Sequence, residues 1–388
     1  MTFYLTPVTG HLLINREEEL KQILSELSKR DSRIGFSLTG IRRVGKTSIL
    51  YDIKEKLEKK GIVVIYISVW KTIPDTLDTF IPNLFDETML AFRDKLPLKM
   101  KMSELARMSK ETLLGFLQHL KLSVELGDDI SYTVSYVRGD EKDFSKATLH
   151  TFNLIDKLAQ KTKTKCVLII DEFPSITELK IGKKMVGPAI VKSIRTINET
   201  YKKTVLVISG SFMHTMQSVA LSPKAPLYKQ LINMEIKPLD RHAIIEFVQT
   251  YMKRKLSEEA IDALLEASSG IPYNLQILCR ELDYLDYRNP DDAAVHKAVE
   301  SVMKREGDLH FREYMNMMQS TEVKVAKTMA LTNAKSPKEI ADQGNMQLND
   351  VTALLLNLLD KGIVKKLDRG EYVFTDNMFK IWLNLSCE

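Results

Sequence analysis

Eight consecutive residues near the start of the chain have the types and spacing that hold a nucleotide phosphate. Residues Gly40 to Thr47 read Gly-Ile-Arg-Arg-Val-Gly-Lys-Thr and fit the G-x-x-x-x-G-K-[ST] pattern of a P-loop. In such a loop, the glycines let backbone N–H groups wrap a phosphate. Lys46 reaches the β- and γ-phosphates, and the Thr47 hydroxyl holds Mg²⁺. These residues therefore predict the binding of a nucleotide with its metal ion.

A second pair of residues, Asp171 and Glu172, has the chemistry to complete this site. The pair follows the uninterrupted apolar run Cys166–Ile170, which is typical of a strand buried in a parallel sheet. Because ligands of open α/β sheets bind at the carboxyl ends of strands, Asp171 is expected to hold Mg²⁺ and Glu172 to deprotonate a water. Taken singly, Lys46 could be an ordinary loop lysine and the carboxylates a solvated strand end. Together they predict one site.

These residues require a strand before the P-loop and a helix behind it. The apolar run Ile34–Leu38 predicts the strand, and apolar residues at helical spacing from Ile49 to Leu57 predict the helix, which Gly61 would end. The predicted strands lie near 34–39, 62–68, 165–170 and 204–209. The sequence therefore predicts an α/β fold of the P-loop NTPase type, in which a parallel sheet carries helices on both faces.

Several segments together resemble the archaeal ATPase family of the STAND class, a group of AAA+-related P-loop NTPases. The segments are the P-loop with Ser48, Val167–Pro174, Ile14–Leu20, Leu206–Ser211, Gly270–Pro272 and Phe374–Leu383. The resemblance spans nearly the whole chain. Its motifs are specific for the family but say little about biological role.

The resemblance implies roles for the residues that match family motifs. ATP and Mg²⁺ are the implied cofactors, with Thr47 and Asp171 as metal ligands. Glu172, Lys46 and Ser209 are implied in the hydrolysis of ATP to ADP and phosphate. Pro272 and Ile14 are expected on opposite sides of the adenine, although a proline can also simply begin a helix. The implied P-loop contacts are Gly40, Arg42, Arg43, Val44, Gly45, Lys46, Thr47 and Ser48.

One position departs from the family pattern. Relatives commonly carry Leu-Tyr-Gly-Arg where this chain has Leu227-Tyr228-Lys229-Gln230, and their arginine is a candidate to contact a neighbouring subunit's γ-phosphate. An arginine finger can raise the rate of phosphoryl transfer by orders of magnitude. Unless Lys229, Arg195 or Arg241 substitutes, we expect the slow hydrolysis of a switch.

Composition is that of an ordinary globular protein. The chain has 388 residues, 44% of them hydrophobic, and no membrane segment is expected. Residues Met1–Gly10 lack the basic start and apolar core of a signal peptide. Cys166, Cys279 and Cys387 show no metal-ligand spacing, so reduced thiols and a cytoplasmic location are expected. A net charge of +5 is too small to indicate nucleic-acid binding by itself.

The sequence predicts three units. Residues 1–238 form the ATPase core, 239–304 a helical lid and 305–388 a winged helix domain. Within the core, 72–150 is expected to hold inserted helices and a β-hairpin, because residues 122–126 and 130–137 alternate around the turn residues 127–129. That hairpin is interpreted as a flap packed on the core or, alternatively, as a partner-binding arm.

The last unit has the element order of a winged helix-turn-helix. Helices are expected at 322–331, from 336 and at 347–360, followed by a hairpin at 363–374 that turns at 368–370. Many such domains place the third helix in the DNA major groove. Here that helix contains no Lys or Arg, and residues 304–388 hold twelve Lys and Arg against twelve Asp and Glu. Lys365, Lys366 and Arg369 could form a basic wing or a solvated face.

Three functions stay open at this point. The first is an ATPase switch whose nucleotide state moves the lid and winged helix and is read by a macromolecular partner, with protein favoured over sequence-specific DNA. The second is a DNA-binding machine resembling archaeal replication initiators. The third is a nucleotide-dependent scaffold with negligible turnover. The neutral third helix favours the first over the second, and the complete catalytic set favours it over the third. A nucleotide-dependent oligomer is compatible with the first.

Overall fold

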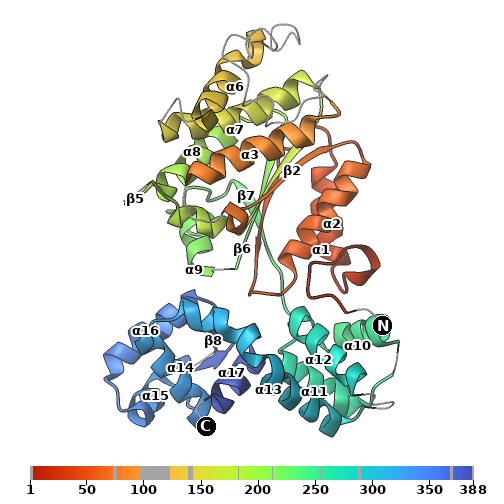
Figure 1. The fold of residues 1–388 in the computed structure, drawn as a ribbon, viewed down its shortest axis with the longest axis vertical. Coiled ribbons are helices and arrows are strands. Elements are labelled where there is room, and N and C mark those ends of the chain that lie inside the picture. Colours follow the sequence, from red (N-terminus) through yellow and green to blue (C-terminus); the bar gives the residue numbers. More distant parts are fainter. Residues whose placement is uncertain are drawn as a thin grey trace.

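The computed structural model describes residues 3–72, 77–95, 123–138, 143–181, 183–211, 213–253, 255–285, 290–367 and 370–386. These residues form two bodies (Figure 1). One, from α1 to β7, is built on a β-sheet and is called the core here. The other, from α10 to α17, consists of helices and a small hairpin and is called the helical body.

Within the described residues, the core has a five-stranded sheet in the order β2-β3-β6-β1-β7, with every neighbouring pair parallel. The strands are β1 Gly35–Thr39, β2 Val63–Ser68, β3 Cys166–Asp171, β6 Thr204–Gly210 and β7 Leu231–Glu235. The four predicted strands are confirmed. The edge strand β7 was missed because two of its central residues, Ile232 and Asn233, are exposed and give it no continuous apolar run.

Helices cover both faces of the sheet, which confirms the predicted α/β P-loop fold. Along β3, Val167 and Ile169 pack with the helices α1 and α2, whereas Leu168 and Ile170 pack with α3, α6, α7 and α8. This alternation follows from the two-residue period of a strand. The core helices are α1 Glu17–Leu27, α2 Lys46–Lys59, α3 Leu77–Phe92, α6 Ser123–Arg138, α7 Phe144–Lys161, α8 Gly187–Thr200 and α9 Met213–Met216.

The predicted hairpin at 122–137 is wrong. Leu122 lies outside the described residues, and Ser123–Arg138 forms the helix α6, which packs on α7. Ile130 and Val134 are buried one helical turn apart, so the alternating residues also make a helical stripe. Asp129, predicted in the turn, is instead held by His150 at 2.6 Å and by Lys157 at 2.5 Å. Packing on α7 therefore overrides the local turn residues.

The remaining core elements are short. They are the strands β4 Lys180–Ile181 and β5 Lys184–Met185, and the helical turns η1 Gly10–Leu12, η2 Val69–Thr72, η3 Phe173–Glu178 and η4 Gln217–Leu221. No helix among the described residues is both long and apolar enough to cross a membrane.

The first two helices of the helical body begin with side-chain caps. The Asp240 carboxylate accepts from the Ala243 N–H at 2.9 Å, and the Ser257 hydroxyl from the Ala260 N–H at 3.2 Å. Its helices are α10 Arg241–Met252, α11 Glu258–Ser268, α12 Pro272–Tyr284, α13 Asp292–Met317, α14 Ser320–Thr332, α15 Pro337–Gly344, α16 Leu348–Asp360 and α17 Asn377–Leu385. The hairpin is β8 Val364–Lys366 and β9 Tyr372–Phe374. Residues 368–369 of its expected turn lie outside the described residues.

The helical body has one apolar core. Residues from α10 to α17 belong to the same buried cluster, in which the Phe311 ring lies 5.7 Å from Phe379 and 5.9 Å from Trp382. The helix α13 runs without a break across residue 304, so the expected boundary between lid and winged helix falls inside a helix. The division into 239–304 and 305–388 stays a prediction, but both segments contribute to the same buried apolar cluster.

A buried carboxylate joins the two ends of the helical body. Asp376 caps α17 by accepting from the Phe379 N–H at 3.3 Å and also accepts from the Asn274 side chain of α12 at 2.9 Å. Within the described residues its Oδ2 atom has no hydrogen-bond partner. Burial raises the pKa of Asp376 to about 6. The charged form therefore opposes folding at neutral pH.

Replacing Asp376 with Asn should remove this opposition. In the wild type, the Asp376 carboxyl group is protonated in both the folded and the unfolded state below about pH 4. Above about pH 6, the folded state must bury the charged carboxylate. Relative to Asp376→Asn, the wild-type free energy of unfolding should fall by about 2 kcal/mol between pH 4 and pH 7. Denaturant unfolding at several pH values measures it. The exposed Asp342→Asn controls for loss of a negative charge, and a difference independent of pH would contradict the expectation.

Candidate functional site

The backbone of the P-loop depends on its two motif glycines. Gly40 has φ 152° and Gly45 has φ 102°, conformations that side chains rarely adopt. At Gly40 a Cβ atom would also lie 2.4 Å from the Ile236 carbonyl oxygen, in the segment that follows β7. Gly45 leads directly into α2, whose first residue is Lys46. The loop therefore opens the N-terminus of α2 toward the site.

Lys46 and Thr47 occupy the positions that the motif requires. Lys46 is buried, and its ammonium donates to the Gly40 and Ile41 carbonyl oxygens, each at 2.9 Å. Burial lowers the pKa of Lys46, an effect that the charges of Glu172 and Asp171 oppose. The Thr47 hydroxyl donates to Asp171 Oδ2 at 2.8 Å. The structure thus brings together the two residues expected to hold the metal.

Asp171 is held by hydroxyl groups from three elements. Besides Thr47 on α2, it accepts from the Tyr66 hydroxyl of β2 at 2.7 Å and from the Ser209 hydroxyl of β6. Burial, followed by the Asp171 charge, raises the pKa of Tyr66 and keeps its hydroxyl protonated. Ser209 lies at the expected strand end, and its part in hydrolysis stays a prediction. Tyr66 was missed, although its hydroxyl in an otherwise aliphatic run is a usable signal.

Glu172 is placed by an unusual backbone conformation. Its φ of 52° lies in the left-handed region, and its carboxylate accepts from the Ser211 hydroxyl at 3.0 Å. Burial raises the pKa of Glu172, and the Lys46 charge acts in the opposite direction. A carboxylate with a raised pKa is a stronger base toward water. This geometry fits the predicted role of Glu172.

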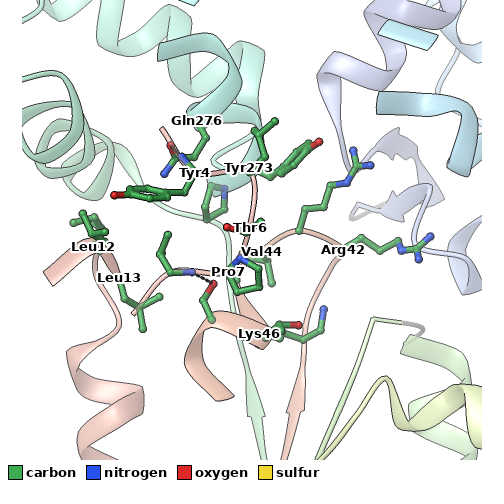
Figure 2. Close-up of a pocket in the computed structure, with 18 of the residues that line it drawn as sticks. Tyr4, Thr6, Pro7, Leu12, Leu13, Arg42, Val44, Lys46, Tyr273 and Gln276 are labelled. Atoms are coloured by element: carbon green, nitrogen blue, oxygen red, sulfur yellow. Dashed lines mark hydrogen bonds between the residues drawn. The ribbon is translucent and has the colours of Figure 1, made fainter. Parts of the chain in front are cut away.

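A pocket of about 350 Å³ lies between the core and the helical body. Figure 2 shows Arg42 and Lys46 on one side of it and Tyr4, Leu12 and Leu13 on the other. The sequence-predicted residues that line it are Ile14, Arg42, Arg43, Val44, Gly45, Lys46, Thr47, Ser48, Glu172 and Pro272. Asp171 lies behind Thr47. The pocket therefore joins a cationic end, suited to phosphates, to an apolar end, suited to a base.

Part of the pocket wall comes from an irregular segment that the sequence did not predict. The Tyr4 N–H donates to Gln276 of α12 at 3.2 Å, and the Val8 N–H donates to the Ser48 hydroxyl at 3.2 Å. Residues 4–8 all line the pocket and so bridge the helical body and the core. The segment has no helical or strand period, so no sequence signal marked it.

The structure also fits Mg²⁺. No group of three or more His, Cys, Asp or Glu that could hold a metal occurs in the described part of the chain. Thr47 and Asp171 supply one hydroxyl and one carboxylate oxygen. Mg²⁺ commonly takes few protein ligands and completes its shell with phosphate oxygens and water. This pair would hold it in that way.

The positions considered for an arginine finger lie away from the pocket. Gln230 bonds with Asn198 at 3.0 Å and with Glu199 at 2.8 Å. Arg195 donates to the Pro226 carbonyl oxygen at 2.7 Å, and Arg241 pairs with acidic residues of α11. Neither these residues nor Lys229 lines the pocket. Within this chain, none of them serves the pocket directly.

Comparison with known proteins decides the family. Residues 13–278 match a family described as an ATPase domain found predominantly in Archaea. This chain belongs to that family. Two relatives of this chain come from Methanocaldococcus jannaschii. An uncharacterized protein is 26% identical over 226 residues, 56% of this chain and 48% of the relative. An uncharacterized ATP-binding protein is 27% identical over 174 residues, 43% of this chain and 44% of the relative. The chain thus spans about half the length of these curated relatives.

Solved structures share the fold of this chain. A Walker-type ATPase of Pyrococcus abyssi matches with a TM-score of 0.69 at 18% identity, covering 99% of both chains. The ORC2 protein of Aeropyrum pernix, solved as ADPNP and ADP complexes, matches with a TM-score of 0.55 at 11% identity, covering 99% of this chain and 96% of that chain. At such identities the likeness shows the fold alone.

Two substitutions separate nucleotide binding from hydrolysis. Glu172→Gln should keep nucleotide affinity but lower phosphate release by about 100-fold or more, because an amide cannot accept the water's proton. Lys46→Ala should instead weaken ATP binding, since it removes the charge that meets the β- and γ-phosphates. Equilibrium titration and a phosphate-release assay measure both, with the exposed Glu235→Gln of β7 as a control. Wild-type turnover in Glu172→Gln would sink the assignment of the base.

Proposed function

We propose that this protein is a STAND-class switch that hydrolyses ATP to ADP and phosphate. The observation that carries the proposal is the composition of the pocket. It is lined by the P-loop of the core and by Pro272, Tyr273 and Glu313 of the helical body. A nucleotide there contacts both bodies, and its γ-phosphate can favour one arrangement of them only by binding that arrangement more tightly. Pro272 and Ile14 are proposed to contact the adenine.

The P-loop also touches the helical body directly. The Arg43 guanidinium lies over the Tyr273 ring at 4.4 Å and donates to the His310 carbonyl oxygen at 2.9 Å. Arg42 pairs with Glu313 of α13 at 2.7 Å. Because the helical body has one apolar core, a change at these contacts would move α10 to α17 together. This supports a mechanical role for the nucleotide.

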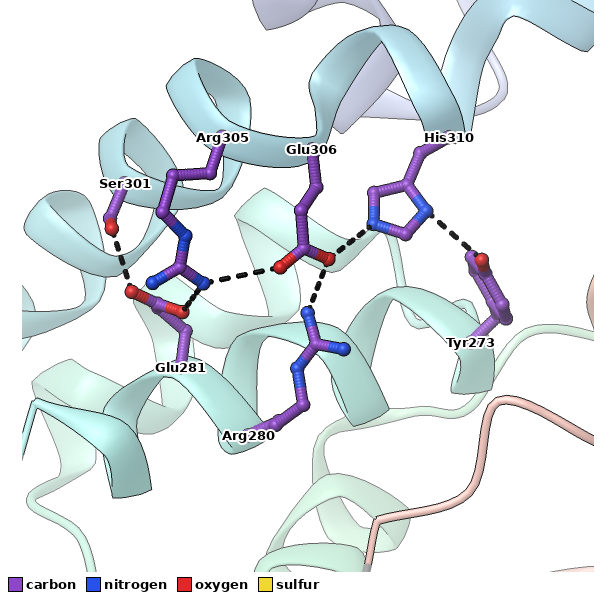
Figure 3. Close-up of polar contacts among 7 residues, drawn as sticks. All are labelled: Tyr273, Arg280, Glu281, Ser301, Arg305, Glu306 and His310. Carbon is purple, nitrogen blue, oxygen red and sulfur yellow. Dashed lines mark hydrogen bonds and ion pairs between the residues drawn. The ribbon is translucent and has the colours of Figure 1, made fainter.

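A network of hydrogen bonds and ion pairs extends from Tyr273 into the helical body (Figure 3). The Tyr273 hydroxyl bonds His310 Nδ1 at 3.0 Å, and His310 Nε2 bonds Glu306 at 3.2 Å. Glu306 is also held by Arg280 of α12 at 2.5 Å. Burial lowers the pKa of His310, so a neutral ring can accept from Tyr273 and donate to Glu306. The network fixes α12 against α13.

The residues of the site would perform the reaction as follows. Thr47 and Asp171 would hold Mg²⁺, which would neutralise charge on the phosphate oxygens. Lys46 meets the β- and γ-phosphates, and Tyr66 with Ser209 orients the Asp171 carboxylate. Glu172 accepts the proton of the attacking water. The helical body covers the pocket and limits the access of bulk water.

The partner is proposed to be a protein. In the C-terminal part, α14, α15, α16 and the β8–β9 hairpin have the order of a winged helix-turn-helix. Leu348 and Leu356 of α16 are 47% and 49% exposed, and the helix carries no Lys or Arg. Such a surface suits protein contact better than phosphates. The location is proposed to be cytoplasmic, and nucleotide-dependent assembly is compatible with the switch.

Coupling can be tested at Pro272. We expect a non-hydrolysable ATP analogue to compact the wild type, as measured by small-angle scattering. Pro272→Ala should weaken ATP binding and reduce this compaction together, because the residue belongs to the helical body and lines the pocket. Pro337→Ala, which also changes a proline at the start of a helix, is the control away from the pocket. Unchanged dimensions with nucleotide and normal binding by Pro272→Ala would favour a scaffold.

A separate measurement tests the alternative, a DNA-binding ATPase. If Lys365 and Lys366 of β8 contact only phosphates, any duplex affinity should fall steeply with salt and barely change with sequence. Unrelated duplexes should be titrated at low and physiological salt. A sequence preference at physiological salt that is lost in Asn349→Ala or Asn357→Ala would show base reading by α16 and reverse the choice of partner.

A further inference from the structure

An ATPase of this kind needs a positively charged group beside the γ-phosphate, where it stabilises the negative charge of the transition state. In this chain Gln230 stands where relatives carry an arginine, and Arg195 and Arg241 are engaged away from the pocket. The arginines that line the pocket are Arg16, Arg42 and Arg43. The source of the charge can therefore be sought among these three.

Two of the three have other tasks. Arg16 is buried and donates to the Lys237 carbonyl oxygen at 2.7 Å and to the Val44 carbonyl oxygen at 3.3 Å, so it supports the backbone around the P-loop. Arg43 lies between the Tyr273 ring at 4.4 Å and the Tyr314 ring at 5.6 Å. Its contacts tie the loop to the helical body. Arg42 remains.

Arg42 lies at the catalytic end of the pocket. It is two residues past Gly40 in the P-loop, and its guanidinium lies over the Trp70 ring at 4.6 Å. Arg42, Lys46 and Glu172 all line the same pocket. Arg42 therefore shares the pocket with the lysine proposed to meet the phosphates and with the carboxylate proposed to meet the water.

We propose that Arg42 stabilises the γ-phosphate in cis and that Glu313 of α13 controls it. This inference rests on the proposed ATPase switch. It assigns to Arg42 the role of the arginine that relatives carry at the position of Gln230. The guanidinium fork matches phosphate oxygens.

In the proposed step, the water oxygen forms a bond to the γ-phosphorus while the bond between the γ-phosphorus and the β–γ bridging oxygen breaks. The water's proton passes to Glu172, the electron pair leaves with ADP, and Arg42 neutralises the charge on the transferred group.

Glu313 competes with the phosphate for the same guanidinium. Its carboxylate lies 2.7 Å from Arg42, and its side chain is 46% exposed. Ion pairs with an exposed partner contribute about 1 kcal/mol or less, so a triphosphate can displace this one. Since α13 belongs to the helical body, a partner that shifts this body would withdraw Glu313 and release Arg42. Glu313 thus acts as a positioning residue that links partner binding to turnover.

A purely structural pair would behave differently. If Arg42 and Glu313 only fastened α13 to the P-loop, either substitution would loosen the two bodies and change turnover in the same direction. In our proposal the two substitutions have opposite effects. Glu313→Gln removes the competing charge and keeps the arginine, whereas Arg42→Lys keeps a positive charge but loses the fork.

The expected steady-state results are as follows. Glu313→Gln should raise kcat about threefold to fivefold, the equivalent of losing a weak ion pair. Arg42→Lys should lower kcat about tenfold and Arg42→Ala about 100-fold, with ADP affinity within about twofold of wild type. Adding Glu313→Gln to Arg42→Ala should change nothing further. Glu300→Gln, elsewhere on α13, is the matched control.

Mixing experiments test action in cis. Turnover per molecule should be independent of protein concentration, and an equal mixture of Lys46→Ala and Arg42→Ala chains should stay inactive. Recovery in the mixture would overturn the proposal, since the arginine would then act between subunits. Wild-type turnover in Arg42→Ala or Arg42→Lys, lost ADP binding in both, or reduced turnover in Glu313→Gln would also overturn it. If Glu172→Gln is still inactive, the proposed ATPase function survives that failure. If the wild type shows no turnover, both the proposed ATPase function and the proposed role of Arg42 are wrong.

Discussion

The site depends on one buried carboxylate, Asp171, at the carboxyl end of β3. A buried charge is tolerated only where hydrogen bonds or an ion compensate it. Hydroxyls of Thr47, Tyr66 and Ser209 do so here, each from a different element. Meeting this requirement fixes how the start of α2 and the ends of β2 and β6 lie around β3. The same geometry brings together the Thr47 and Asp171 oxygens, which we propose as the ligands of Mg²⁺.

The sequence predicted this half of the site because its signals are local. A P-loop and an apolar run that ends in Asp-Glu each lie within about eight residues, and parallel strands bring their ends together. The strands of the sheet centre were predicted for the same reason. Prediction failed where the local pattern of apolar residues fits both a strand and a helix, as in α6. Packing on α7 selects the helix there. It also failed at β7, an edge strand whose apolar residues are interrupted by Asn233.

The other half of the pocket depends on contacts that no local pattern shows. Arg43 and the His310 carbonyl oxygen that it reaches are 267 positions apart, and Tyr4 meets Gln276 across 272 positions. These pairs form only because the helical body folds back over the P-loop. The motif could place Arg42 near phosphates, but not beside Glu313. An arginine's partner, rather than its type, decides here whether it supports the backbone, as Arg16 does, or joins the P-loop to the helical body, as Arg43 does.

The polar network behind Tyr273 indicates why the helical body can respond as a unit. Glu281 is fully buried and is held by Ser301 at 2.6 Å and by Arg305 at 2.7 Å (Figure 3). Removing one partner from such a charge is strongly destabilising, so α12 and α13 cannot slide past each other without losing several bonds. A displacement at Tyr273 or Glu313 must therefore carry both helices with it. Through the shared apolar core it then reaches α16, which is the surface proposed to meet the partner.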